Sequence, residues 1–233
     1  EKIYDGTPLT YYAALITSEL TPILVNSHRS ALKYQGSQTD AGTSANKVTE
    51  FWVFDGNRDV TNNYEITKID GTLTVTPRPI LVTAGSAEKI YDGEPLTSGK
   101  YEVTSELSFA LVKGQRGQVT NKGSQTDAGS CVNRIFDVAV YADERDVSAN
   151  YEITCENGLL TVIPISLRCL TEGAEKLYDG TELRKEGWEF IEGATLENHT
   201  LTIRGTRGAI TYPGYCYNEP DYTVVDNDTQ RDV

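Results

Sequence analysis

The chain has two histidines, His28 and His199, the side chains whose ordinary pKa best suits proton transfer near neutral pH. They stand in unrelated sequence contexts, and neither recurs elsewhere in the chain. No Gly-x-Ser-x-Gly, His-Glu-x-x-His or glycine-rich phosphate-binding motif accompanies them. The many carboxylates cannot be told apart from an acidic surface. The sequence therefore offers no catalytic residue, and we expect the protein not to be an enzyme.

Two acidic turns carry oxygen ligands at the short spacing that Ca²⁺ prefers. They are Asp55-Gly56-Asn57-Arg58-Asp59 and Asp226-Asn227-Asp228. Neither forms the regular twelve-residue calcium loop, and an arginine interrupts the first. We interpret both as solvated turns and expect neither a metal nor a cofactor.

An aromatic cluster near the C-terminal end is the best candidate for ligand binding, because Tyr and Trp stack on sugar rings and on protein partners. The candidate residues are Trp188, Tyr212, Tyr215, Tyr217 and Tyr222. Alternation along a strand would place Tyr215 and Tyr217 on one face. Cross-strand packing on a sheet is the alternative interpretation.

These residues are set in a repeated sequence. Glu-Lys-Ile-Tyr-Asp-Gly at 1–6 returns at 88–93, and again with Leu for Ile at 175–180, so the copies begin 87 residues apart (88 − 1 and 175 − 88). A fixed period of this size indicates a string of small domains. Asp-Gly favours a tight turn, so we interpret the triplet as structural. Its members are Tyr4, Asp5, Gly6, Tyr91, Asp92, Gly93, Tyr178, Asp179 and Gly180.

Each repeat shows short alternating or apolar segments bounded by turn residues, and no helical period, which predicts a mainly β fold. Gly-Ser-Gln-Thr-Asp-Ala-Gly, identical at 36–42 and 123–129, is expected to be a loop. A hairpin turning at Asp70-Gly71 or Asn157-Gly158 is expected to close the repeat.

We place the repeats at 1–77, 78–164 and 165–233, called repeats 1, 2 and 3 below. Repeat 1 is expected to lack its opening strand, and repeat 3 its closing hairpin, which another molecule or further chain would complete. The connections are short and contain proline, as in Thr76-Pro77-Arg78-Pro79. Proline fixes φ, so we expect a semi-rigid rod.

The 233 residues carry a net charge of −13 with a pI near 4.6. Such a surface repels nucleic acid and anionic membranes. No apolar run approaches the ~20 residues of a membrane span. Adjacent repeats of a longer chain are the expected covalent neighbours.

The repeated pieces resemble the YDG and MBG domains of bacterial cell-surface adhesins, whose fold is a mucin-binding type β-grasp. The matching pieces are Lys-x-Tyr-Asp-Gly, Gly-Ser-Gln-Thr-Asp-Ala-Gly, Asp-Val-Thr-x-Asn-Tyr-Glu-Ile and Gly-Thr-Leu-Thr-Val-Thr-Pro. They cover repeats 1 and 2 nearly end to end and the first part of repeat 3. The resemblance implies β-grasp-like repeats, with the first and last strands parallel and adjacent. An immunoglobulin-like sandwich is the alternative, since it also suits short strands with frequent turns.

The resemblance also implies an extracellular place on a cell wall, chiefly of Gram-positive bacteria. We expect a semi-rigid stalk, with binding of host glycans or mucin through repeat 3, where the loop motif is replaced. One alternative is a dedicated binding module for a host protein such as immunoglobulin. Another, of a different class, is an accessory domain of an enzyme.

The four cysteines are expected to form disulfides, because their number is even and the chain looks exported. Internal alignment places Cys131 where repeat 1 has Ser44, and Cys155 where it has Lys68. Cys216 aligns with Cys131, and Cys169 with Val82. We predict the pairs Cys131–Cys155 and Cys169–Cys216.

Overall fold

In the computed structural model the regular secondary structure of the described residues consists of β-strands and two short 3₁₀ turns, as expected of the mainly β fold that the sequence predicts. The structure describes residues 1–19, 21–25, 27–193 and 196–232. These residues contain no α-helix. Two 3₁₀ turns, η1 (Thr61–Asn63) and η2 (Ser148–Asn150), occupy equivalent places in repeats 1 and 2. The mainly β prediction is therefore confirmed.

The chain divides into two compact units whose boundaries differ from those of the sequence repeats. Compact unit 1 consists of Glu1–Ala84, Lys100–Asn121 and Ile135–Asn157. Compact unit 2 consists of Gly85–Gly99, Lys122–Arg134 and Gly158–Val233. Repeat 2 thus contributes to both units, and each unit is described by itself.

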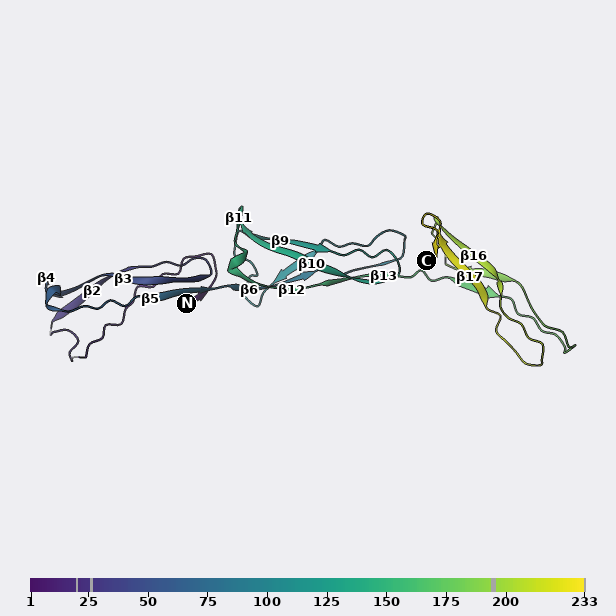
Figure 1. The fold of residues 1–233 in the computed structure, drawn as a ribbon, viewed down its shortest axis with the longest axis horizontal. Helices are drawn as coiled ribbons and strands as arrows, with labels where there is room; N and C mark the ends of the chain where they lie inside the picture. The colour runs from purple at the N-terminus through teal and green to yellow at the C-terminus, as the bar shows by residue number, and fades with distance from the viewer. Residues whose placement is uncertain (20, 26, 194–195, 233) are drawn as a thin grey trace. The chain divides into compact units, whose positions relative to one another are not determined.

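Repeat 1 forms one sheet, in which the order of strands is β1 (Lys2–Ile3), β5 (Gly71–Thr76), β3 (Gly42–Asp55) and β2 (His28–Gln35). A short strand, β4 (Arg58–Asp59), pairs with the end of β3. The pairs β2–β3 and β3–β5 are antiparallel, whereas β1 and β5 are parallel. Figure 1 shows β2 and β3 side by side.

Repeat 2 contributes a sheet to compact unit 1 in the order β12 (Tyr151–Glu156), β6 (Arg78–Ala84) and β8 (Tyr101–Thr104). Alternation along β6 buries Ile80, Val82 and Ala84, the inward side of a half-buried strand. The pair β6–β12 is parallel, and the pair β6–β8 is antiparallel.

The second sheet of repeat 2 has the order β11 (Arg145–Asp146), β10 (Gly129–Ala142), β13 (Gly158–Ile163) and β7 (Ala87–Ile90). The strand β9 (Gln115–Lys122) also pairs with β10. The residues of β10 belong partly to each compact unit, since the division falls after Arg134.

The hairpin that we expected to close each repeat is not formed. The strands β12 and β13 follow one another and pair with β6 and β7, both in parallel. A two-residue hairpin of the expected kind needs positive φ at its turn, and neither Gly71 nor Gly158 has it. In repeat 2 the side-chain oxygen Oδ1 of Asn157 instead accepts a hydrogen bond from the Ile135 N–H at 2.9 Å. The closing segment therefore runs alongside the opening segment in one direction.

Repeat 3 has two separate sheets within compact unit 2. One contains β14 (Arg168–Thr171) and β15 (Trp188–Glu192), which are antiparallel. The other has the order β16 (His199–Thr206), β17 (Pro220–Asp226) and β18 (Arg231–Asp232).

The main hydrophobic core of compact unit 1 contains residues of two repeats. Its buried members are Tyr4, Val75, Ile80, Val82, Val140, Val147 and Tyr151. Repeat 1 supplies the first two, and repeat 2 supplies the other five. The end of repeat 1 is therefore packed into the same core as repeat 2.

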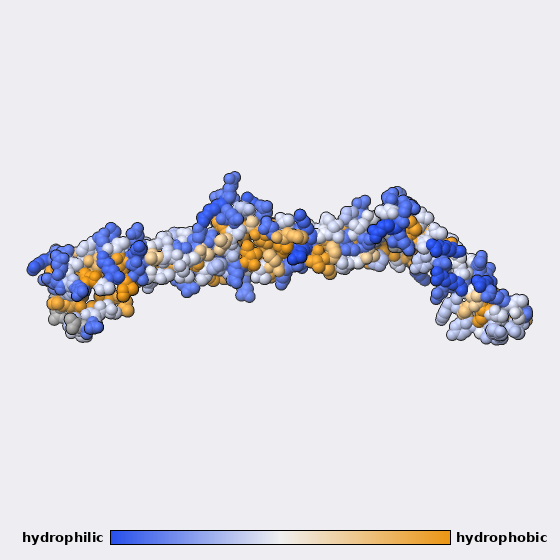
Figure 2. All heavy atoms as spheres, in the orientation of Figure 1, coloured by the Kyte–Doolittle hydropathy of each residue, from blue (hydrophilic) through white to orange (hydrophobic). Residues whose placement is uncertain are grey.

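Figure 2 shows that hydrophilic residues cover most of the visible face and that hydrophobic residues show through in limited patches. This agrees with the strongly negative net charge of the chain. In the described parts of the chain, no helix has the length and apolar character that crossing a membrane would require.

Candidate functional site

Each of the two histidines shares a hydrogen bond with a tyrosine that is distant in the sequence. His28 Nδ1 lies 2.7 Å from the Tyr64 hydroxyl oxygen, and His199 Nε2 lies 2.8 Å from that of Tyr91. Among the described residues no cluster of three or more His, Cys, Asp or Glu could hold a metal ion. In each of the two acidic turns a carboxylate accepts a hydrogen bond from a nearby backbone N–H. Asp59 accepts from the N–H of Thr61, and Asp226 accepts from that of Asp228.

The Tyr-Asp-Gly turn has the same geometry in each repeat. In repeat 1 the Asp5 carboxylate accepts hydrogen bonds from the Thr7 N–H at 2.9 Å and from Lys2 Nζ at 2.5 Å. The hydrogen bond from Lys2 is the main cause that lowers the pKa of Asp5 to about 2. Gly6 has a φ of +77°, a conformation that side chains rarely adopt.

The other two turns repeat this arrangement. Lys89 bonds Asp92, and Lys176 lies 2.9 Å from Asp179. Each of these hydrogen bonds lowers the pKa of its aspartate. The turn thus fixes the direction in which the tyrosine of its own Tyr-Asp-Gly triplet projects.

The tyrosine of the first turn is the centre of the joint between repeats 1 and 2, which lies wholly within compact unit 1. Tyr4 is 3% exposed, and its ring meets that of Tyr151 edge to face with centroids 5.7 Å apart. Gln115 links the two hydroxyls. Its Nε2 donates to Tyr4 at 2.8 Å, and its Oε1 accepts from Tyr151 at 2.6 Å. A polar network of this kind, buried and satisfied, fixes one packing arrangement.

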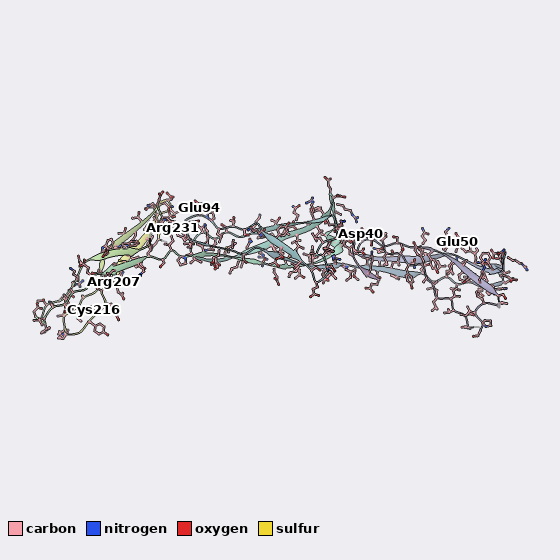
Figure 3. The ribbon with its side chains drawn as sticks, turned by 180° about the vertical axis from the view of Figure 1, so that it is seen from behind. Asp40, Glu50, Glu94, Arg207, Cys216 and Arg231 are labelled. Carbon is pink, nitrogen blue, oxygen red and sulfur yellow. The ribbon has the colours of Figure 1, made fainter. Side chains whose placement is uncertain are left out.

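The loop at 36–42 makes the second contact of this joint. The Asp40 carboxylate accepts hydrogen bonds from Arg145 and, at 3.0 Å, from Asn150 Nδ2. The Ala41 N–H donates to Asn150 Oδ1 at 2.6 Å. Arg145 is the main cause that lowers the pKa of Asp40 below its usual range. Figure 3 labels Asp40 in this loop.

Arg78, just after the connecting proline, ties the backbone of both repeats together. Its Nε donates to the Ala110 carbonyl at 3.0 Å, and Nη1 donates to the Tyr4 carbonyl at 3.4 Å. Its Nη2 donates to the Phe109 carbonyl. The joint therefore has an aromatic, an ionic and a backbone contact.

The joint between repeats 2 and 3 lies wholly within compact unit 2 and uses equivalent positions. The Tyr91 ring meets His199 edge to face at 5.4 Å, and the two side chains share a hydrogen bond. Asp127, the counterpart of Asp40, lies 3.9 Å from Arg231, the counterpart of Arg145. Both joints thus place the tyrosine of Tyr-Asp-Gly and the aspartate of the loop on the next repeat.

The position that contacts this tyrosine has an equivalent in each repeat. The three positions are occupied by His28, Gln115 and His199, and the backbone N–H of each donates to the carbonyl three residues before it. In repeat 1 the pair His28–Tyr64 has the arrangement of Gln115–Tyr151. Among the described residues, Gln115 contacts Tyr4 and His199 contacts Tyr91, in each case the Tyr-Asp-Gly tyrosine of the repeat before.

The four cysteines are free thiols in the structure, so neither predicted disulfide is formed in it. The pair Cys131–Cys155 rested on an expected antiparallel register between their strands. Cys131 instead lies opposite Leu160 of β13, and Cys155 opposite Val82 of β6. Cys169 lies opposite Phe190. Cys216 is exposed in the loop before β17 (Figure 3).

The aromatic residues of repeat 3 do not form one cluster. Tyr212, Tyr215 and Tyr217 share the exposed loop between β16 and β17, where they are 75%, 86% and 80% exposed. Tyr215 and Tyr217 are in edge-to-face contact at 6.3 Å, but no strand is formed there. Tyr222 lies on β17 opposite Ile203, and Trp188 lies on β15 opposite Thr171.

Three asparagines that sequence reasoning missed connect loops within each repeat, and we call this arrangement the asparagine clamp. The Asn133 Nδ2 donates to the Gly85 and Ser98 carbonyls, both at 2.9 Å. Asn218 Nδ2 makes the equivalent pair of bonds in repeat 3, and Asn46 Nδ2 bonds a carbonyl in repeat 1.

A sequence signal for these asparagines exists. Each stands ten residues after a glycine, at 36, 123 and 208 (46 − 36, 133 − 123 and 218 − 208). That glycine lies directly against the asparagine. A Cβ on Gly123 would lie 2.9 Å from the Asn133 Cα. The glycine and the asparagine ten residues after it therefore pack against each other.

Comparison with family models, with curated proteins and with solved structures gives no match for this chain.

Proposed function

We propose that this chain is part of the repeat region of an extracellular bacterial adhesin, where it acts as a semi-rigid stalk without catalytic activity. The observation that carries the proposal is the repeated joint. At both joints the Tyr-Asp-Gly tyrosine bonds the equivalent position of the next repeat, and the loop aspartate pairs with the equivalent arginine, Arg145 or Arg231. Motifs reused in this way serve the alignment of successive domains.

The arrangement of the strands supports β-grasp-like repeats over an immunoglobulin-like sandwich. In repeat 2 the opening strands β6 and β7 lie parallel and adjacent to the closing strands β12 and β13. Parallel pairing of the first and last strands is what we expect of a β-grasp. The sandwich alternative consists of antiparallel sheets.

The stalk proposal is tested by measuring whether the joint is rigid in solution. We expect ¹⁵N relaxation to give one rotational diffusion tensor for residues 1–76 and for the residues of repeat 2 in compact unit 1. Gln115→Ala removes both hydroxyl contacts, so repeat 1 is expected to tumble faster than its neighbour. Gln118→Ala, at an exposed position of the same strand, is the matched control. Independent tumbling in the unmodified protein would contradict the stalk.

A binding role in repeat 3 is a second function that one observation favours. The loop that carries the docking aspartate in repeats 1 and 2 instead presents Tyr212, Tyr215 and Tyr217 to solvent. Tyr212 stands at the position of Asp40, and Pro213 at that of Ala41, so this loop has lost the carboxylate and the N–H that make the first joint. Exposed tyrosines suit stacking on host glycans or glycoproteins.

This role predicts that changing all three tyrosines to serine lowers binding to immobilised mucin at least tenfold. The matched control changes Tyr11 and Tyr12 to serine, since both are exposed tyrosines of repeat 1. Surface plasmon resonance of the full chain measures the effect. Equal binding by the unmodified chain and both variants would rule out the tyrosine loop as the binding surface.

A further inference from the structure

Tension applied along the chain enters repeat 2 at the strand β6 and leaves it at the strand β13. Thr76 ends β5 of repeat 1 and Arg78 begins β6, so only Pro77 separates the two strands. Ile163 ends β13, and Pro164 follows it directly. Neither connection contains a loop that could lengthen under tension. A pull on the chain therefore acts at once on the first residue of β6 and on the last residue of β13.

Both of these strands are central in their sheets. The strand β6 lies between β12 and β8, and β13 lies between β10 and β7. Figure 1 shows β6 beside β12. Val82 on β6 and Leu160 on β13 are fully buried, so water is kept away from the backbone around them. A strand that is paired on both sides cannot leave its sheet without breaking two sets of backbone hydrogen bonds.

The direction of the pairing decides how tension loads these bonds. Residues 78–83 lie opposite 151–156, and residues 87–90 lie opposite 160–163, both in parallel. Tension pulls the opening strands towards their N-terminal end and the closing strands towards their C-terminal end. In a parallel pair these directions are opposite, so the strands are driven to slide along each other. The hydrogen bonds run across from strand to strand, so sliding loads all of them together and not one at a time.

Additional hydrogen bonds hold the two ends at which tension acts. At the entry, the Arg78 side chain donates to the Ala110 carbonyl at 3.0 Å and to the Phe109 carbonyl. At the exit, the Tyr91 N–H donates to the Ile163 carbonyl at 2.8 Å. The residues that are pulled first are therefore also held by contacts beyond the strand pairing.

We propose that the paired opening and closing strands of repeat 2 are a mechanical clamp, by which the repeat bears tension without unfolding. This function rests on the stalk proposed above, because a stalk is the part of a surface protein through which tension passes. Forced unfolding depends on the rate of crossing the unfolding barrier. The clamp raises that barrier for a pull on the two ends of the repeat. Repeat 1 has the same exit, since β1 and β5 are parallel and the Tyr4 N–H donates to the Thr76 carbonyl at 2.9 Å.

Single-molecule pulling on the full 233-residue chain in two directions tests the clamp. DNA handles are attached through azidophenylalanine, either at Pro77 and Pro164 or at Pro77 and Ala149, all exposed positions. The first pair of handles slides the opening strands along the closing strands. The second pair pulls apart the starts of β6 and β12, so that their bonds open in succession. We expect the first pair to need about twice the rupture force or more at the same pulling speed.

Equal rupture forces in the two directions would overturn the clamp. That result would leave the stalk proposal intact, because the rigidity of the joint is measured separately by ¹⁵N relaxation. Both labelled chains share the handle at Pro77, so any effect of that substitution is present in both measurements.

Two valine substitutions of equal size separate the clamp from general stability. Val82→Ala shortens a side chain of β6, and Val140→Ala shortens one of β10, which pairs with neither β6 nor β12. Both valines are fully buried in the same core, so both variants are expected to lower the midpoint of urea unfolding. Only Val82→Ala is expected to lower the rupture force between Pro77 and Pro164. No fall for Val82→Ala, or an equal fall for Val140→Ala, would overturn the clamp.

Discussion

Replacing Tyr151 by alanine is expected to lower the free energy of unfolding of compact unit 1 by about 3–5 kcal/mol, the usual cost of deleting a buried aromatic ring. Tyr151 is 6% exposed and packs against Tyr4. Its hydroxyl donates to Gln115 and accepts from the Val112 N–H at 3.1 Å. The substitution therefore leaves a cavity and two polar groups without their partner.

The position of Tyr151 gives this substitution a second effect. The ring contributes to the core that residues of repeats 1 and 2 share. Its loss is expected to uncouple the two repeats, so that urea unfolding followed by NMR shows two transitions for the residues of compact unit 1. In the unmodified protein these residues are expected to unfold together.

Tyr64 provides the matched control for Tyr151. It stands at the equivalent position of repeat 1 and makes the same contacts with His28 and the Val25 N–H. No preceding tyrosine packs on it in the described residues, and it is only partly buried. Tyr64→Ala is therefore expected to cost less than half as much and to leave the coupling intact. Equal effects of the two substitutions would show that the joint adds nothing to stability.

The β class of the fold could be predicted from the sequence, because alternation and turn residues are local properties of the chain. The direction of the closing segment could not be. Asn157-Gly158 is a strong hairpin signal in isolation. In the structure the Asn157 side chain bonds the Ile135 N–H, and Gly158 is buried and opposite Asn133. Tertiary pairing of β12 and β13 with the opening strands decides the path instead.

The joints were hidden from sequence reasoning for a related reason. The repetition of Tyr-Asp-Gly and of the loop at 36–42 is plain, but repetition alone does not tell a turn within a repeat from a contact between repeats. The partners Gln115 and His199 differ in type, so they do not stand out as a motif. Only the structure shows that both contact the Tyr-Asp-Gly tyrosine of the repeat before, Tyr4 for Gln115 and Tyr91 for His199.

Replacing Asn133, the clamp asparagine of repeat 2, is expected to have the second large effect on the free energy of unfolding. Asn133 is fully buried, and its Nδ2 is the donor for the carbonyls of Gly85 and Ser98. Alanine at this position would take that donor away from both part-buried acceptors. An unsatisfied buried polar group costs about 1–3 kcal/mol. We expect Asn133→Ala to destabilise the protein by about 3 kcal/mol or more in urea unfolding.

Asn133→Asp separates the loss of donors from the loss of volume. The carboxylate has the same shape, but it places a negative charge beside two carbonyl oxygens. Folding therefore favours its protonated form and raises its pKa above the unfolded value of about 3.9. The loss of unfolding free energy caused by Asn133→Asp is therefore smallest below about pH 3.9 and grows as the pH rises above that value. We expect the variant to lose more stability between pH 4 and pH 7 than the unmodified protein does.

Asn121→Ala is the control for this position, because the Asn121 Nδ2 donates to the Lys100 carbonyl at 3.0 Å on the exposed surface. Water can replace that donor, so the expected cost is below about 1 kcal/mol. If Asn133→Ala were as mild as Asn121→Ala, the two carbonyls would have found water, and the clamp would not be what joins the loops of the repeat. If Asn133→Asp showed no added pH dependence, the donor role assigned to Nδ2 would be wrong.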